Sequence, residues 1–277
     1  MNPHNLFVSI IGADNAVCAI EKAPVDGIPV IATAMLAETS AVFGSGNIGR
    51  LAVNIVANRL LSAGAEPRYI SATATIDIDT DVNVVKEVAE GMRDAAVDAE
   101  MEWASVEAVA KQSGPVKGIA LSAFGVGRKM INVTSRFDCP RSGDVIITTG
   151  PVAATGAAVE GYRRGIDVLT LSDGTVLIDV MRAVYVQAPN LSGVIYPIRG
   201  IRSALNELGV EAEIDSDKVP VTDVVASACS QLGIDPLDTA TADAMLLTVA
   251  PADASRVIEA VRRYPAGRYA AAIGHVK

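Results

Sequence analysis

The chain has 277 residues, of which 50% are hydrophobic and 4% aromatic, so it can bury the core of one large domain or two ordinary ones. Its net charge of −9, with Lys and Arg scattered along the chain, argues against nucleic acid as a partner, because an acidic surface repels phosphate backbones. No run of about 20 apolar residues could span a bilayer, and the first residues lack the basic and apolar segments of a signal peptide.

Cysteine usage indicates the compartment. Cys18, Cys139 and Cys229 lie far apart and have no metal-type spacing. A small odd number of cysteines is typical of a reducing environment. We therefore expect a cytoplasmic protein with no membrane partner.

The first half of the chain is predicted to alternate strands and helices. Short apolar, β-branched or alternating stretches predict strands at Val8–Ile11, Ile28–Thr33, Tyr69–Asp77 and Ile119–Val126. A helix is predicted from Asn47, a suitable N-cap, to Ala63, with Gly64 at its C-terminal end. The segment Asp81–Met101 is predicted to be an amphipathic helix, because its valine and methionine residues recur at helical spacing.

A breaker-rich segment, Arg136–Asp144, predicts a boundary between domains 1–138 and 139–277. Beyond it, strands are predicted at Val145–Thr149, Val194–Tyr196, Met245–Val249 and Ala270–Ile273. Helices are predicted at Val152–Arg164, Ser172–Val184, Ile198–Leu208, Val221–Leu232 and Ala252–Arg263. Mixed elements in both halves indicate an α/β or α+β fold.

Three short motifs each allow a structural and a functional interpretation. Gly44–Gly49 has the glycine spacing of a dinucleotide loop and opens a helix, so it either binds an anion or only connects two elements. The acidic run Asp77, Asp79 and Asp81 resembles a cation-binding segment, but helix capping by Asp81 with solvated charge is the favoured interpretation. Gly150–Gly156 joins a strand to a helix and is interpreted as a compact turn.

Several segments together carry a family resemblance from about Ile11 to Val276. Gly12–Val17 resembles Gly-Asp-Asp-Ala-Ala-Val, and Ile48–Pro67 resembles Ile-Gly-Lys-Leu-Ala-Val followed by Asn-Asp-Leu-Ala-x-Met-Gly-Ala-x-Pro. Tyr196–Gly200 and Ala204–Glu207 resemble Asp-Pro-Thr-Arg-Gly-Gly and Ala-Leu-Asn-Glu. These motifs are similar to those of the PurM superfamily, which includes thiamine-monophosphate kinase, selenophosphate synthetase and the hydrogenase maturation factor HypE, the most similar of these.

The resemblance implies a PurM-like fold of two α/β domains, with the N-terminal mixed sheets pairing across a homodimer. It also implies ATP in a nearby cleft, with Mg²⁺ held by clustered aspartates, since carboxylates approach a triphosphate only when metal ions stand between them. The terminal Pro-Arg-Ile-Cys of HypE is missing from Gly274–Lys277, so the resemblance implies no cyanation chemistry on a C-terminal thiol if the chain is complete.

The acidic positions of this family are largely changed. Asp14 is retained and is the candidate metal ligand. Where the family has carboxylates, this chain has other residues: Ala13, Ala34, Arg59, Ser105 and Tyr196. The candidate nucleotide-binding or anion-binding residues are Asp14, Thr33, Arg50, Asn58, Arg59 and Arg199. Arg50 and Arg59 are nine residues apart on one helix, so they point to different sides.

Two hypotheses follow. In the first, the protein is an ATP-dependent enzyme that phosphorylates an oxygen or amide of a small substrate or protein group. In the second, which we favour, it is a non-catalytic or metal-independent protein that binds a small molecule or a maturation partner. An arginine contacts phosphate or carboxylate directly, without a metal ion. A salt bridge of Arg59 at the dimer interface is an equally good interpretation of that residue.

Overall fold

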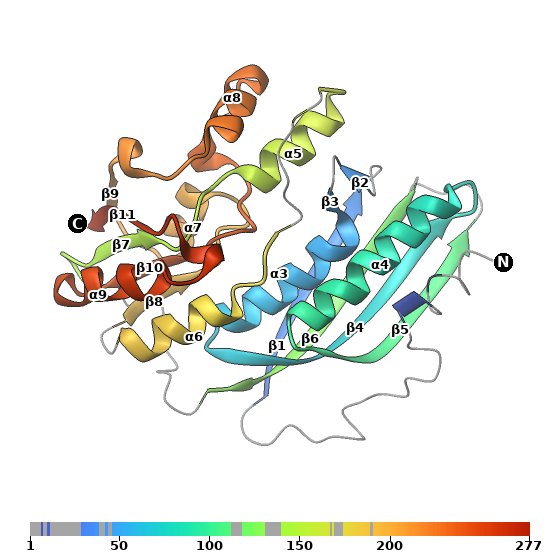
Figure 1. The fold of residues 1–277 in the computed structure, drawn as a ribbon, viewed down its shortest axis with the longest axis horizontal. Helices are drawn as coiled ribbons and strands as arrows, with labels where there is room; N and C mark the ends of the chain where they lie inside the picture. The colour runs from blue at the N-terminus through green and yellow to red at the C-terminus, as the bar shows by residue number, and fades with distance from the viewer. Residues whose placement is uncertain are drawn as a thin grey trace. The chain divides into compact units, whose positions relative to one another are not determined.

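The structure is a computed structural model that describes residues 7, 10–11, 29–38, 42–43, 46–111, 118–130, 140–166, 168, 174–188 and 191–277. The chain divides into two compact units, Met1–Leu60 with Ala65–Met130 and Leu61–Gly64 with Ile131–Lys277. Each unit combines a sheet with helices, which confirms the predicted α/β class (Figure 1). The predicted limit between residues 138 and 139 stays a prediction, because it falls outside the described residues.

The main sheet of the first unit is mixed. Its strands are, in spatial order, β1 (Pro29–Glu38), β6 (Ile119–Lys129), β4 (Ala65–Asp77) and β5 (Glu102–Lys111). Helix α4 (Val82–Asp98) links the parallel strands β4 and β5, and the other neighbours are antiparallel. A short ladder of β2 (Val42–Phe43) and β3 (Gly46–Asn47) precedes α3 (Ile48–Ser62).

Both predicted helices of this unit have the predicted starts. Asn47 Oδ1 accepts a hydrogen bond from Arg50 N at 2.9 Å, and Asp81 Oδ1 accepts one from Asn83 N at 2.8 Å. These side chains cap α3 and α4, so the capping interpretation of Asp81 is confirmed. Helix α3 ends shortly before Gly64, whose φ is +73°.

Helices α3 and α4 lie side by side and approach very closely at Gly49 (Figure 1). A Cβ atom on this residue would stand 2.1 Å from the carbonyl oxygen of Val88 on α4. Only a residue without a side chain permits this contact between the two backbones. The glycine of α3 therefore sets how closely the two helices pack.

We expect Gly49→Ala to lower the free energy of unfolding by about 1–3 kcal/mol, because the added methyl group forces the two helices apart. Chemical denaturation followed by circular dichroism measures the change. Val97→Ala on α4 is the control, since Val97 is exposed and its truncation should change stability by less than about 0.5 kcal/mol. A Gly49→Ala variant as stable as the control would contradict the packing argument.

Three predictions from the sequence need correction. The strand Val8–Ile11 is wrong at its described residues, because Ile10 and Ile11 are helical and share one helical face with Phe7. Strand β5 was not predicted, although its burial alternates along the strand. The helix predicted from Ser172 begins only at Ile178, since residues 174–177 are irregular.

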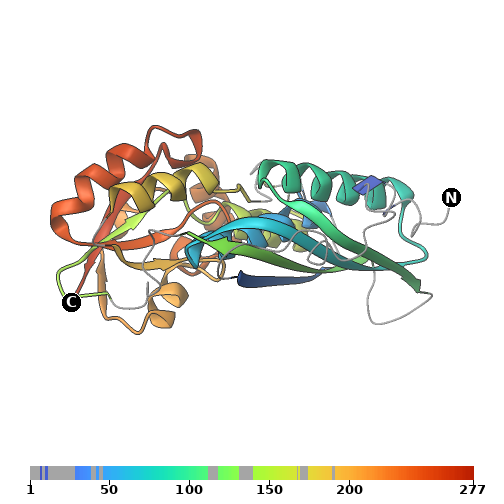
Figure 2. The same cartoon turned by 90° about the horizontal axis from the view of Figure 1, so that it is seen from below.

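The second unit has a five-stranded antiparallel sheet covered on both faces. The spatial order is β8 (Leu191–Ile195), β10 (Leu246–Val249), β7 (Val145–Thr148), β11 (Ala271–Val276) and β9 (Ala212–Ile214). One face packs in a common core with α5 (Ala154–Arg163), α7 (Ile201–Glu207) and α8 (Asp223–Leu232). Helices α6 (Ile178–Gln187) and α9 (Pro251–Val261) pack together and lie on the other face (Figure 2).

Burial of the strands follows from this arrangement. Ile146 and Leu246 belong to the core shared with α5 and α8, whereas their neighbours Ile147 and Leu247 point to the opposite face and are buried as well. Continuous apolar runs are therefore required in β7 and β10. Among the described residues, none of the helices is long and apolar enough to cross a membrane.

Candidate functional site

The structure brings two of the predicted site residues together in the first unit. Arg59, near the end of α3, donates a hydrogen bond from Nη1 to the backbone carbonyl oxygen of Thr33. Thr33 lies on β1, which is an edge strand of the sheet. The guanidinium group therefore joins the helix to the sheet edge and places a positive charge beside this strand.

The other two candidates on α3 have different surroundings. Arg50 Nη1 pairs with Asp98 Oδ2 on α4 at 2.9 Å. Arg50 and Arg59 thus contact different elements, as their spacing predicts. Asn58 is fully buried. A buried amide requires hydrogen-bond partners, so Asn58 contributes to the internal structure of the first unit.

Arg199 belongs to the second unit, where it precedes α7. Its Nη2 lies 3.5 Å from Glu207 Oε1, and the side chain is 72% exposed. The nearby Arg202 pairs with Asp235 Oδ2 at 2.9 Å. The backbone N–H of Leu237, together with Arg202, holds the pKa of Asp235 below its usual range. These carboxylates are therefore engaged in ion pairs around α7.

Asp14, the predicted metal ligand, lies outside the described residues. Within the described ranges, no three side chains of the His, Cys, Asp or Glu type converge as they would around a metal ion. Ala34 is 3% exposed and follows Thr33 on β1. A carboxylate at that position would need compensation for its burial.

Tyr196 has a structural role that the sequence did not indicate. The side chain is 6% exposed, and its hydroxyl group donates to the carbonyl oxygen of Ala242 at 3.1 Å. In the residue before Ala242, Thr241 Oγ1 accepts a hydrogen bond from Ala153 N at 2.9 Å. The loop before β10 is therefore held between the end of β8 and the start of α5.

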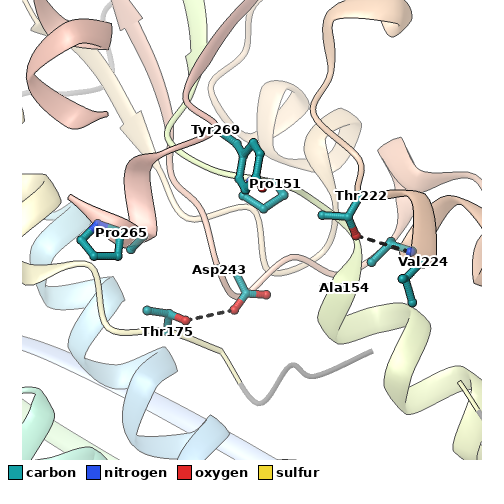
Figure 3. A pocket seen from close by; sticks show the side chains of 10 residues that line it. Pro151, Ala154, Thr175, Thr222, Val224, Asp243, Pro265 and Tyr269 are labelled. Carbon is teal, nitrogen blue, oxygen red and sulfur yellow. Dashed lines mark hydrogen bonds between the residues drawn. The ribbon is translucent and has the colours of Figure 1, made fainter. Parts of the chain in front are cut away.

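A cavity of about 380 Å³ lies next to this loop, within the second unit (Figure 3). The sheet register explains its position, since Thr148 at the end of β7 faces Leu246 at the start of β10 and Ala271 at the start of β11. The segments that follow β7 and precede β10 and β11 thus meet at one end of the sheet. They supply Pro151 and Asp243 to the cavity wall.

Two features keep the cavity wall compact. A Cβ atom on Gly150 would stand 3.0 Å from the carbonyl oxygen of Ala266 and 3.1 Å from that of Asp243. The glycine thus lets three backbone segments meet behind the cavity. Thr149 Oγ1 also accepts a hydrogen bond from Met245 N at 2.8 Å.

The sequence did not identify this cavity as a site. Its lining comes from Pro151, Thr175, Thr222, Asp243 and Tyr269, which are far apart in the chain and match no local motif. The sequence predicts only a compact turn at Gly150–Gly156 and assigns no role to Asp243. The one available signal was a carboxylate in an otherwise apolar segment.

Comparison with known protein families identifies the class. The model of the AIR synthase related protein, N-terminal domain, matches residues 12–129. The model of the corresponding C-terminal domain matches residues 199–277. The chain therefore belongs to the AIR synthase related, or PurM, superfamily, which confirms the resemblance found in the sequence.

Within this superfamily the chain is similar to HypE. Carbamoyl dehydratase HypE of Rhizobium leguminosarum bv. viciae is 31% identical over 242 residues, which are 84% of this chain and 69% of that protein. The crystal structure of the hydrogenase maturation protein HypE in complex with ATP superposes on this one with a TM-score of 0.89. The two sequences are 25% identical, and the match covers 99% of this chain and 84% of that chain. A chain in the crystal structure of a HypE–HypF complex is 25% identical to this one, with a TM-score of 0.85, and the match covers 92% of this chain and 86% of that chain.

Proposed function

We propose that this protein is a HypE-like, metal-independent ligand-binding or assembly factor with a changed ATP–Mg²⁺ site. The observation that carries the proposal is the guanidinium group of Arg59 beside Thr33. In the family resemblance a carboxylate stands at position 59. An arginine in its place repels Mg²⁺ and contacts an anionic ligand directly.

The neighbouring positions support the same conclusion. Ala34 is apolar where the resemblance has an aspartate. At position 59, an arginine in place of an aspartate makes the local charge about two units more positive. Mg²⁺ needs hard oxygen ligands, mostly carboxylates and water, so the described residues here do not fit that ion. We propose a nucleotide or another anion as the ligand, with Thr33 and Arg59 near it, and leave any metal role to Asp14.

A homodimer is part of the proposal. On the face of the first unit's sheet that α3 and α4 leave uncovered, Ile31 is 60%, Val109 47% and Phe124 36% exposed. Thr33 pairs directly with Phe124, so exposed side chains of β1 and β6 lie next to each other on that face. A second copy of the same sheet would bury these apolar side chains. In addition, the complex between HypE and HypF supports a maturation partner protein.

An ATP-dependent enzyme is the second candidate, and the similarity to HypE in complex with ATP favours it. In that case the protein would phosphorylate an oxygen or amide group, such as the carbamoyl group in the name of its relatives. Asp14 and residues outside the described part would have to hold the metal ion.

Calorimetric titration with ATP, once with Mg²⁺ and once with EDTA, separates the two candidates. We expect ATP to bind with the same affinity in both buffers, within about threefold, because direct contacts to arginine do not require the metal. ATP hydrolysis should not exceed that of a protein-free blank. Micromolar binding that disappears with EDTA would rule out the metal-independent site and favour the enzyme.

A further inference from the structure

The carboxylate of Asp243 is the main polar group of the cavity in the second unit. Thr155 Oγ1 donates to its Oδ2 at 3.3 Å, and Thr175 Oγ1 donates to its Oδ1 at 3.4 Å. The two hydroxyl groups come from α5 and from the segment before α6, and Figure 3 shows the hydrogen bond from Thr175. An ionised carboxylate only accepts hydrogen bonds, so a ligand that contacts Asp243 has to be a donor.

The rest of the wall is mainly apolar. Hydrocarbon surface of the cavity comes from Pro151, Val224, Pro265 and Tyr269 (Figure 3). The Tyr269 ring is held by Arg268, whose guanidinium carbon lies 4.9 Å from the ring centroid and whose Nη2 donates to the hydroxyl oxygen at 2.8 Å. An aromatic side chain in the wall suits a compact apolar ligand body.

Charge and size together define the ligand. Among the described residues that line the cavity, Asp243 alone carries a charged side chain. The cavity volume of about 380 Å³ is near the lower end for small-molecule sites, so it suits one compact ligand. A carboxylate in the wall of a mainly apolar cavity favours a cationic ligand, because a charge-assisted hydrogen bond to carboxylate is stronger than a neutral one.

We infer that this cavity binds a small organic ammonium ion, with the ammonium group on Asp243 and an apolar body between Pro151 and Tyr269. The inference goes beyond the proposed function, since it uses the second unit alone and no residue of the Arg59 region. The frame around Asp243, which includes Tyr196, Thr241 and Gly150, keeps the carboxylate in place for such a ligand.

Benzylammonium is a suitable probe, with the neutral benzyl alcohol and the anionic benzoate as analogues of similar shape. Titration of the full chain, followed by NMR without nucleotide, should give a dissociation constant of about 1 mM or below for benzylammonium. Benzyl alcohol and benzoate should bind at least about tenfold more weakly. The inference would be overturned if benzyl alcohol bound as tightly as benzylammonium, or if benzoate bound more tightly. It would also be overturned if benzylammonium did not bind at 10 mM, roughly ten times the expected dissociation constant.

Two variants locate the site. Asp243→Asn should weaken benzylammonium binding at least about tenfold, whereas the matched control Asp217→Asn, an exposed carboxylate outside the cavity, should leave it unchanged. Val224→Arg should also weaken benzylammonium binding about tenfold through charge repulsion. The fold should accept this substitution, because Val224 is 50% exposed. Wild-type affinity in a folded Asp243→Asn or Val224→Arg protein would place the probe elsewhere. Arg59→Asp should not change this titration, which separates the result from the proposed function.

Discussion

In the Arg59→Asp variant, we expect the affinity for ATP to become at least tenfold higher with Mg²⁺ than with EDTA. The substitution removes a positive charge near Thr33 and restores the carboxylate found in the family resemblance, so a bridging metal ion becomes favourable. In EDTA, the same variant should bind ATP about 10-fold to 100-fold more weakly than wild type, because one charge-assisted contact is lost. Calorimetric titration in the two buffers measures both effects.

Arg93→Asp is the matched control for this experiment. Arg93 lies on α4, is exposed and pairs with its neighbour Asp94, so the substitution changes the net charge equally without touching β1. It should leave ATP binding within about twofold of wild type in either buffer. If Arg59→Asp behaves like Arg93→Asp, Arg59 lies away from the ligand and its bond to Thr33 is only structural. Thermal unfolding of both variants checks that the loss of that bond has not unfolded the first unit.

Phe124→Lys should convert a dimer into monomers. Phe124 lies on β6 next to Thr33 on the uncovered sheet face, and a symmetric dimer would carry the substitution twice. Burying two unpaired ammonium groups should raise the dimer dissociation constant at least about 100-fold, the range found for central interface residues. Sedimentation velocity over a dilution series measures this change.

Val97→Lys provides the comparison for the oligomeric state. Val97 is 73% exposed on α4, and the exposed sheet face belongs to the strands and not to this helix. The control variant should therefore sediment like wild type. A wild-type protein that is monomeric at micromolar concentration would refute the dimer, and a dimeric Phe124→Lys protein would assign its interface to another surface.

If both predictions hold, the ligand site and the dimer share one strand. Thr33 accepts the hydrogen bond from Arg59 and also pairs with Phe124 across β1 and β6. A change in dimerisation would then act on the ligand site through a single strand. Measuring ATP affinity in Phe124→Lys tests this link directly, because an independent site would keep its affinity in the monomer.

Local patterns were sufficient for most elements of the fold. Helices α3 and α4 could be predicted because their caps, Asn47 and Asp81, act within three residues along the chain. The apolar runs of β7 and β10 identified buried strands for a similarly local reason. Strand β5 was missed, since its alternation is weak without knowledge of its neighbour β4. The segment Val8–Ile11 was misjudged because four apolar residues fit either period.

The sequence by itself determined the superfamily and the α/β class, because the motif residues and the apolar patterns are local features of the chain. Only the tertiary structure decided what these residues contact. The partner of Arg59 is a backbone carbonyl on a distant strand, and Tyr196 supports a loop 46 residues further along the chain. The cavity at Asp243 exists because the sheet register brings the ends of β7, β10 and β11 together. Long-range strand pairing creates such a site, and no local pattern encodes it.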